Sequence, residues 1–147
     1  MAERRRALGL LDTSVVIDLE RVDPASLPAA FAISAITLAE LAAGPHATDD
    51  ADERARRQDR LQRVEATFDP LPFDGSAARA YGRVYAAVAA VGRKTRGRRA
   101  LDLLIAATAL AASLPLYTCN PADFADVAGL VDVVPVTSGA VNRGGYR

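Results

Sequence analysis

Three carboxylates of this sequence stand in unusually apolar surroundings. Asp12 ends the apolar run Leu8–Leu11, Glu40 interrupts a mainly apolar segment, and Asp102 lies in the run 101–107, which is apolar on every helical face. An ionised carboxylate in low-dielectric surroundings is costly unless something compensates its charge. A divalent cation is one such compensation, and clustered carboxylates suit Mg²⁺ or Mn²⁺, which prefer oxygen ligands. These residues therefore indicate metal-dependent chemistry at an acidic site.

The elements that must position these acids read as an α/β fold. Strands are predicted at Leu8–Leu11, Phe31–Ser34, Pro70–Phe73, Leu116–Cys119 and Val131–Val136. Helices are predicted at Val15–Val22, up to Ala43, at Thr48–Thr67, Ser76–Val91 and Arg99–Ser113, and from Asn120 onward. The strand runs are apolar rather than alternating, which favours a mainly parallel sheet covered by helices on both faces. We therefore predict a three-layer α/β/α domain.

Topology would bring four oxygen donors to one edge of this sheet. In an open parallel sheet, sites form beyond the carboxyl ends of the strands. Asp12 ends the first predicted strand and Asn120 follows the strand at Leu116–Cys119. Glu40 and Asp102 each lie within a turn or two of a helix start. We expect these side chains to converge.

Two of the acids also have purely structural explanations. Asp12 could cap the helix that follows it, because aspartate is a preferred cap residue. Thr37 and Glu40 match a capping box, in which the two side chains satisfy the first backbone N–H groups of a helix. For Glu40 the box and the ligand role remain open at this point.

The other two donors have structural alternatives as well. Asp102 could be a first-turn residue favoured by the helix dipole, or it could pair with Arg98 or Arg99. Asn120, followed by proline and then by Asp123, is typical of a helix start, so capping is the default explanation there. Taken singly, none of the four positions decides the function.

Taken together, four segments resemble the motifs of the PIN-domain family, and in particular its VapC-type toxins. They occur in the order of the family's motifs, at Leu11–Asp18 (LDTSVVID), Ser34–Leu41 (SAITLAEL), Asp102–Ala109 (DLLIAATA) and Leu116–Phe124 (LYTCNPADF). The resemblance covers about residues 8 to 136. It implies a PIN-like three-layer α/β/α domain.

The resemblance also implies a function. A member of this kind is a magnesium-dependent endoribonuclease toxin that cleaves single-stranded regions of RNA. It is neutralised by a cognate small antitoxin protein, and it usually forms homodimers or hetero-oligomers with the antitoxin. By carry-over, Asp12 and Asp102 are the principal metal ligands, and Glu40 binds the metal or orients it through water. The cofactor is Mg²⁺, with Mn²⁺ as a substitute.

One position departs from the family's pattern. Where the family has a fourth acid after the last of these strands, this sequence has Asn120, which offers a carbonyl oxygen but no charge. Asp123 either replaces that acid or caps the helix. The hydroxyls of Thr13, Ser14 and Thr118 are expected to hydrogen-bond the carboxylates or the scissile phosphate.

A basic segment immediately precedes Asp102. Five positive charges fall within seven residues without an acid among them: Arg93, Lys94, Arg96, Arg98 and Arg99. The segment is either a solvated loop or a rim that contacts RNA phosphates. Its position beside a predicted metal ligand favours phosphate contacts.

Composition sets the wider limits. The chain has 147 residues, 18 basic and 18 acidic side chains, and a single cysteine. We expect one domain over residues 1–137, a disordered tail over 138–147, and no signal peptide or membrane span. A reducing cytoplasm suits the lone cysteine. The zero net charge argues weakly against non-specific coating of nucleic acid, but local phosphate contacts need no overall charge.

Two other functions were weighed. Haloacid-dehalogenase phosphatases also begin with a strand that ends in aspartate, but they need a second aspartate where this sequence has Ser14. A non-catalytic PIN-like module that only binds an antitoxin or regulates is the stronger alternative. Asn120 favours that module, whereas the intact acids at positions 12, 40 and 102 favour the enzyme.

Overall fold

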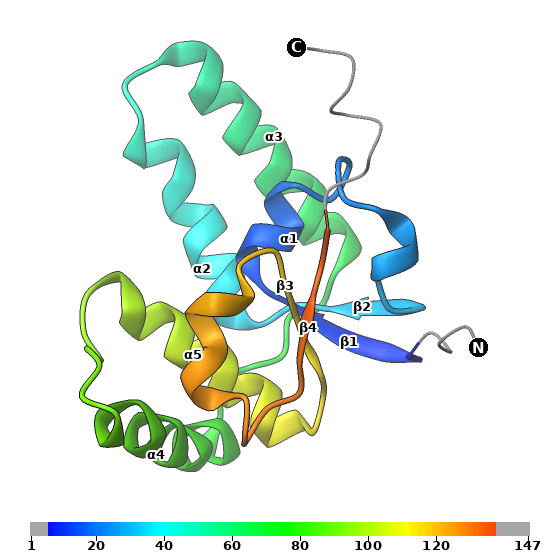
Figure 1. The fold of residues 1–147 in the computed structure, drawn as a ribbon. Coiled ribbons are helices and arrows are strands. Elements are labelled where there is room, and N and C mark those ends of the chain that lie inside the picture. The colour runs from blue at the N-terminus through cyan, green and yellow to red at the C-terminus, as the bar shows by residue number, and fades with distance from the viewer. Residues whose placement is uncertain (1–5, 138–147) are drawn as a thin grey trace.

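The computed structural model describes residues 6–137, whose strands form a single parallel sheet (Figure 1). The strands are β1 Leu8–Leu11, β2 Ala30–Ala32, β3 Leu116–Thr118 and β4 Val133–Pro135. Their order across the sheet is β2-β1-β3-β4, and each neighbouring pair runs parallel. The predicted parallel sheet is confirmed. The predicted tail at 138–147 lies outside the described residues.

Helices connect the strands. They are α1 Thr13–Ile17, α2 Ala35–Ala43, α3 Ala51–Thr67, α4 Gly75–Ala90 and α5 Arg98–Ala112, with 3₁₀ segments η1 Pro24–Ser26, η2 Gly44–Ala47 and η3 Pro121–Val127. Helices α2 and α3 project together from the sheet, and α4 and α5 pack against each other (Figure 1). None of the helices within residues 6–137 combines the length and apolarity needed to cross a membrane.

Side chains of β1 and β3 alternate between two cores. Leu10 and Leu116 pack with residues of α4 and α5 in one cluster, whereas Leu11 and Tyr117 pack with residues of α1, α2 and α3 in the other. Successive residues of a strand point to opposite faces, so a central strand covered by helices on both sides must be apolar throughout. The three-layer α/β/α architecture predicted from these apolar runs is confirmed.

The register of the sheet aligns the ends of its central strands. Leu11 of β1 is paired with Tyr117 of β3, and the Asp12 backbone N–H donates to the Tyr117 carbonyl oxygen at 2.8 Å. Asp12 and Thr118 therefore leave the sheet side by side. Strand β2 pairs with the other side of β1 and leads into α2, so the carboxyl ends of three strands meet at one edge.

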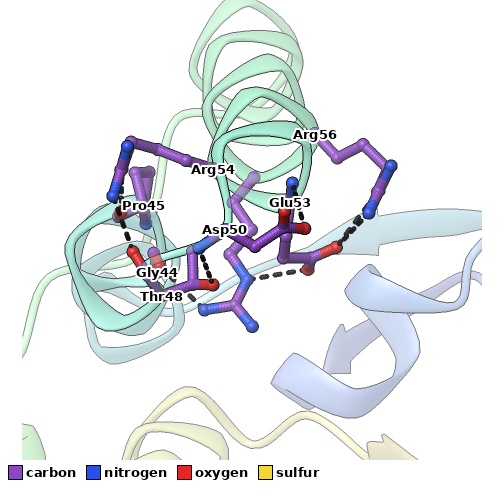
Figure 2. A network of polar contacts seen from close by, with 8 residues as sticks. Gly44, Pro45, Thr48, Asp50, Glu53, Arg54 and Arg56 are labelled. Atoms are coloured by element: carbon purple, nitrogen blue, oxygen red, sulfur yellow. Dashed lines mark hydrogen bonds and ion pairs between the residues drawn. The ribbon is translucent and has the colours of Figure 1, made fainter.

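Arginine side chains fasten the turn between α2 and α3 (Figure 2). Arg57 donates to the Gly44 carbonyl oxygen at 2.9 Å and to Glu53 Oε2 at 2.8 Å. Arg54 donates to two further carbonyl oxygens of the same turn, at 3.2 and 2.8 Å. Much of the charge on α3 thus satisfies backbone groups where one helix ends and the next begins.

The strand predicted at Pro70–Phe73 and the helix predicted at Val15–Val22 both differ from the structure. The strand predicted at Pro70–Phe73 is wrong: Leu71 makes only an isolated parallel bridge with Ser34. The prolines on either side of Leu71 lack the N–H groups that a continuing ladder needs. The helix predicted at Val15–Val22 ends at Ile17 instead, and the chain continues in turns.

Candidate active site

Asp12 is held by two hydroxyl groups at the edge of the sheet. The residue is buried, with 5% of its surface exposed. Its Oδ2 accepts hydrogen bonds from Ser14 Oγ at 2.8 Å and from Thr118 Oγ1 at 2.9 Å. The residue occupies the N-cap position of α1, yet its side chain makes no capping hydrogen bond, so the structural explanation of Asp12 as a cap is wrong. Both bonds fall on Oδ2, which leaves Oδ1 without a partner among the described residues.

Glu40 is held by a second pair of hydroxyls. Thr13 Oγ1 donates to Glu40 Oε1, and Thr13 Oγ1 lies 2.9 Å from the hydroxyl oxygen of the buried Thr37. Helix α2 is capped by Ser34, whose Oγ accepts from the Thr37 N–H at 3.0 Å. Of the two explanations left open for Glu40, the capping box with Thr37 is therefore wrong, because the cap lies three residues before Thr37. Glu40 is available for another role.

Asp102 differs from both, because no polar group holds it. It lies half-buried in the second turn of α5, past the first turn where the helix dipole acts most strongly. No hydrogen bond or ion pair to its carboxylate forms within residues 6–137, so the alternative explanation of Asp102 as a partner of Arg98 or Arg99 is wrong. Burial, together with repulsion from Asp12, Asp123 and Glu40, raises the pKa of Asp102 from its ordinary 3.8 to about 6, and the charge of Arg99 opposes this shift.

These interactions define an acidic cluster, which consists of Asp12, Glu40, Asp102 and Asp123. Each of the other three carboxylates lies near enough to raise the pKa of Asp102 by charge repulsion. The acids come from β1, α2, α5 and η3, so the fold brings together residues far apart in the chain. Of the four donors expected to converge, Asp12, Glu40 and Asp102 belong to this cluster, whereas Asp123 rather than Asn120 is the fourth acid that acts on Asp102.

The donor set of the acidic cluster fits a hard divalent cation. Within residues 6–137, no three Asp, Glu, His or Cys side chains are grouped tightly enough to form a preassembled metal site. The donors are nevertheless all carboxylates, which Mg²⁺ and Mn²⁺ prefer, and Asp12 Oδ1 is free of protein hydrogen bonds. The negative charges of these acids repel one another, and a bound cation would neutralise them. A metal would have to draw these side chains closer together.

Comparison with known protein families identifies the fold. The model of the PIN domain matches residues 9–130, a span that contains every member of the acidic cluster. The chain belongs to the PIN-domain family.

Relatives place this PIN domain among the VapC-type members. Ribonuclease VapC5 of Mycobacterium tuberculosis is 40% identical over 130 residues, covering 86% of this chain and 93% of the relative. Ribonuclease VapC8 of the same species is 37% identical over 110 residues, covering 74% of this chain and 96% of the relative. The crystal structure of VapBC-5, a member of the VapBC family of toxin-antitoxin systems from M. tuberculosis, superposes with a TM-score of 0.75 at 40% identity, covering 86% of this chain and 95% of that chain.

Two residues of this PIN domain, Asn120 and Asp123, lie at or close to the place where the family's pattern has its fourth acid. Asn120 is exposed, and its side chain makes no capping hydrogen bond, so the predicted asparagine cap is absent; η3 is a 3₁₀ segment rather than an α-helix. The Asn120 backbone N–H donates instead to Thr118 Oγ1 at 2.9 Å. Asp123, in the first turn of η3, supplies the negative charge that reaches Asp102. Which of the two completes a metal site remains a prediction.

Some cations of the basic segment of the PIN domain pair with an acid, whereas the others do not. Arg99 donates to Asp126 Oδ2 at 3.2 Å and to the Asp123 carbonyl oxygen at 2.6 Å, and Arg93 pairs with the same Asp126 oxygen at 3.6 Å. The other cations of the segment are exposed and make no ion pair within residues 6–137: Lys94, Arg96 and Arg98. These three remain suited to phosphate contacts, whereas Arg99 is engaged inside the protein.

Sequence reasoning missed two polar residues of the site. Thr37 is completely buried and contacts the hydroxyl that holds Glu40. The sequence carries a signal for Thr37, because a threonine three residues before the candidate ligand Glu40 lies on the same helix face. Asp126 was also missed, and no local pattern pointed to it, because its partners lie 27 and 33 residues earlier in the chain.

Proposed function

We propose that this PIN domain is a divalent-metal-dependent endoribonuclease toxin that cleaves single-stranded RNA and is neutralised by a cognate antitoxin. That it is a nuclease of the VapC type follows from the family and from the two ribonuclease relatives. The observation that carries the metal-dependent mechanism is Asp102, a half-buried carboxylate that lies near enough to Asp12 and Glu40 to be repelled by them and that accepts no hydrogen bond within residues 6–137.

In this mechanism the chain's own residues hold and orient the cofactor. Asp12, Glu40 and Asp102 would bind Mg²⁺ or Mn²⁺, with Asp123 or Asn120 beside them. When bound, such an ion activates water for attack on phosphorus and stabilises charge on the leaving oxygen. The hydroxyls of Ser14 and Thr118 fix Asp12 through Oδ2, so that Oδ1 could bind the ion. Hydrogen bonds of this kind preorganise ligands before substrate arrives.

RNA would be positioned mainly through its phosphates. Lys94, Arg96 and Arg98 are exposed on the connection that leads into α5, the helix that carries Asp102. Aromatic side chains make up 5% of the sequence, so base stacking has few platforms here. Phosphate contacts dominate affinity and weaken with salt. We therefore expect cleavage to slow at high ionic strength.

A groove between α1 and α3 is the proposed docking site of the antitoxin. Its volume is about 440 Å³. Apolar side chains line it: Val16, Ile17, Leu19, Phe31, Val64 and Phe68. Arg56, Arg60 and Arg63 of α3 border it together with the acids Glu20 and Asp59, and Arg60 makes no ion pair within the described residues. An amphipathic segment with one apolar face and acidic flanks complements this surface. The groove is lined by the end of α1, the short helix that begins directly after Asp12, so α1 connects the groove to the active site.

The test of this function uses the purified full chain and a fluorescent RNA with single-stranded and duplex regions. We expect cleavage of the single-stranded part with Mg²⁺ or Mn²⁺ in a cytoplasm-like buffer, and none with EDTA. If a short open reading frame next to the gene encodes a small protein, adding that protein should suppress cleavage, and Arg60→Glu should weaken the suppression. Light scattering would give the oligomeric state, for which we propose a homodimer. No cleavage with either ion would favour the alternative, a non-catalytic module that binds an antitoxin.

A further inference from the structure

Arg99 connects two segments that each carry a member of the acidic cluster. It lies in the first turn of α5, three residues before Asp102. One guanidinium nitrogen, Nη1, donates to the Asp123 carbonyl oxygen at 2.6 Å, and another, Nη2, donates to Asp126 Oδ2 at 3.2 Å. Both acceptors belong to η3. A single side chain therefore ties the start of α5 to the segment that supplies Asp123.

The burial of this contact shows that Arg99 is built into the fold. Only 17% of the Arg99 side chain and 13% of the Asp126 side chain are exposed. The Arg99 Nε atom is fully buried and has no hydrogen-bond partner. An unsatisfied buried N–H is costly, so this orientation persists because the other two nitrogens are well bonded. By contrast, the neighbouring Arg98 is exposed and makes no such contact.

We propose that Arg99 and Asp126 form a positioning pair, which holds η3 against α5 so that Asp123 stays beside Asp102. The inference rests on the proposed metal-dependent nuclease function of the acidic cluster. Arg99 thus has a different role from Lys94, Arg96 and Arg98, the cations proposed to contact RNA phosphates, although it belongs to the same basic segment. Arg93 adds a second, more exposed contact to Asp126, so one acid anchors both ends of the connection between α4 and α5.

Positioning by Asp126 and charge attraction to RNA predict different effects of replacing this residue. Asp126 is an acid close to a basic surface, so its neutralisation should strengthen RNA binding if charge attraction alone mattered. If Asp126 instead positions η3, Asp126→Asn should lower kcat. Outer partners of metal ligands typically contribute 10- to 100-fold, so we expect about a tenfold loss of kcat with KM for RNA changed less than about twofold.

The kinetic test compares Arg99→Ala, Arg99→Lys and Asp126→Asn with Arg98→Ala and with Arg83→Ala, an exposed residue of α4. Arg99→Ala and Asp126→Asn should lower kcat, and Arg99→Lys should restore part of it. Arg98→Ala should instead raise KM and reduce the salt dependence, as the loss of a phosphate contact does. A rise in KM with unchanged kcat for Arg99→Ala would overturn the proposal.

Hydrogen–deuterium exchange of the metal-free full chain provides a readout independent of activity. We expect faster exchange in residues 121–127 for Arg99→Ala and Asp126→Asn, with the strands unchanged, and wild-type exchange for Arg83→Ala. Unchanged exchange in 121–127 would overturn the proposal even if activity fell. If the wild-type chain cleaves no RNA, the proposed function fails while exchange still decides whether the pair holds η3.

Discussion

Thr118 Oγ1 donates a hydrogen bond to Asp12 Oδ2 at 2.9 Å, across 106 positions of sequence. The backbone N–H of Asn120 donates to the same hydroxyl oxygen at 2.9 Å, so the hydroxyl proton of Thr118 is directed at the carboxylate. Because β1 and β3 are adjacent parallel strands, this contact joins the ends of the two central strands. It orients Asp12 before any ligand binds.

The first prediction concerns this contact. Thr118→Val keeps the shape of the side chain but removes the hydroxyl, so Asp12 loses one of its two donors. We expect kcat for RNA cleavage to fall roughly 10- to 100-fold, as for other outer partners of metal ligands. Thr118→Ser, which retains the hydroxyl, should keep most of the activity. Equal losses in both variants would show that packing of the threonine, rather than its hydrogen bond, supports the site.

The second prediction concerns Glu40 and the hydroxyls that hold it. Thr13→Val removes the donor to Glu40 and should raise the Mg²⁺ concentration needed for half-maximal cleavage. Thr37→Val acts one step farther away, through Thr13, and should produce a smaller shift in the same direction. Metal titrations of cleavage rate measure both. A larger shift for Thr37→Val than for Thr13→Val would contradict the order of contacts seen here.

The third prediction follows from the pKa of Asp102, which is raised from 3.8 to about 6. Between these values the folded protein retains a proton that the unfolded chain has released. The stability contributed by that proton is fully present below the unfolded pKa and is lost as pH rises through about 6. The Tm of the metal-free protein should therefore fall between about pH 4.5 and about pH 7 by more in the wild type than in Asp102→Asn. Thermal unfolding in EDTA measures this, and parallel curves for the two proteins would contradict the raised pKa of Asp102.

The fourth prediction tests the packing beneath the site. A Cβ atom on Gly9 of β1 would lie 2.3 Å from Cε1 and 2.6 Å from Cδ1 of the buried Tyr117 ring. Gly9→Ala should destabilise the fold by about 1–3 kcal/mol, as overpacking does. Gly82 of α4 is the matched control, because nothing lies within 4 Å of its added Cβ. Gly82→Ala should stabilise by roughly 0.5–1 kcal/mol. Urea unfolding measures both, and a neutral Gly9→Ala would contradict the contact.

The sheet and its acidic edge were predictable because they depend on long-range patterns of polarity. A central parallel strand needs apolar residues on both faces, so Leu8–Leu11 was recognisable, and Asp12 stood out where that run ends. Motif order identified the PIN-domain family, and the comparisons confirm it. The strand predicted at Pro70–Phe73 was wrong because an apolar run does not reveal how many ladder hydrogen bonds a segment makes.

Partners within the site were harder to predict, because side-chain contacts across the fold leave no local trace. The spacing of Thr37 and Glu40 fits a capping box, and only the cap formed by Ser34 shows that the helix starts too early for one. Likewise, the sequence does not distinguish Arg99 from its neighbours in the basic segment, whereas the structure shows that Arg99 donates a hydrogen bond to Asp126. Sequence reasoning located the charges, whereas the fold decides which of them are paired.

The most direct test of the account measures the rate of RNA cleavage by the wild type, Asp102→Asn and Asp69→Asn across a range of Mg²⁺ and Mn²⁺ concentrations. Asp69 is an exposed acid outside the acidic cluster and serves as the matched control. We predict that Asp102→Asn loses more than the roughly 10- to 100-fold typical of outer partners, at every metal concentration, while Asp69→Asn cleaves like the wild type. The account would be contradicted if Asp102→Asn cleaved RNA as fast as the wild type, or if the wild type still cleaved RNA in EDTA.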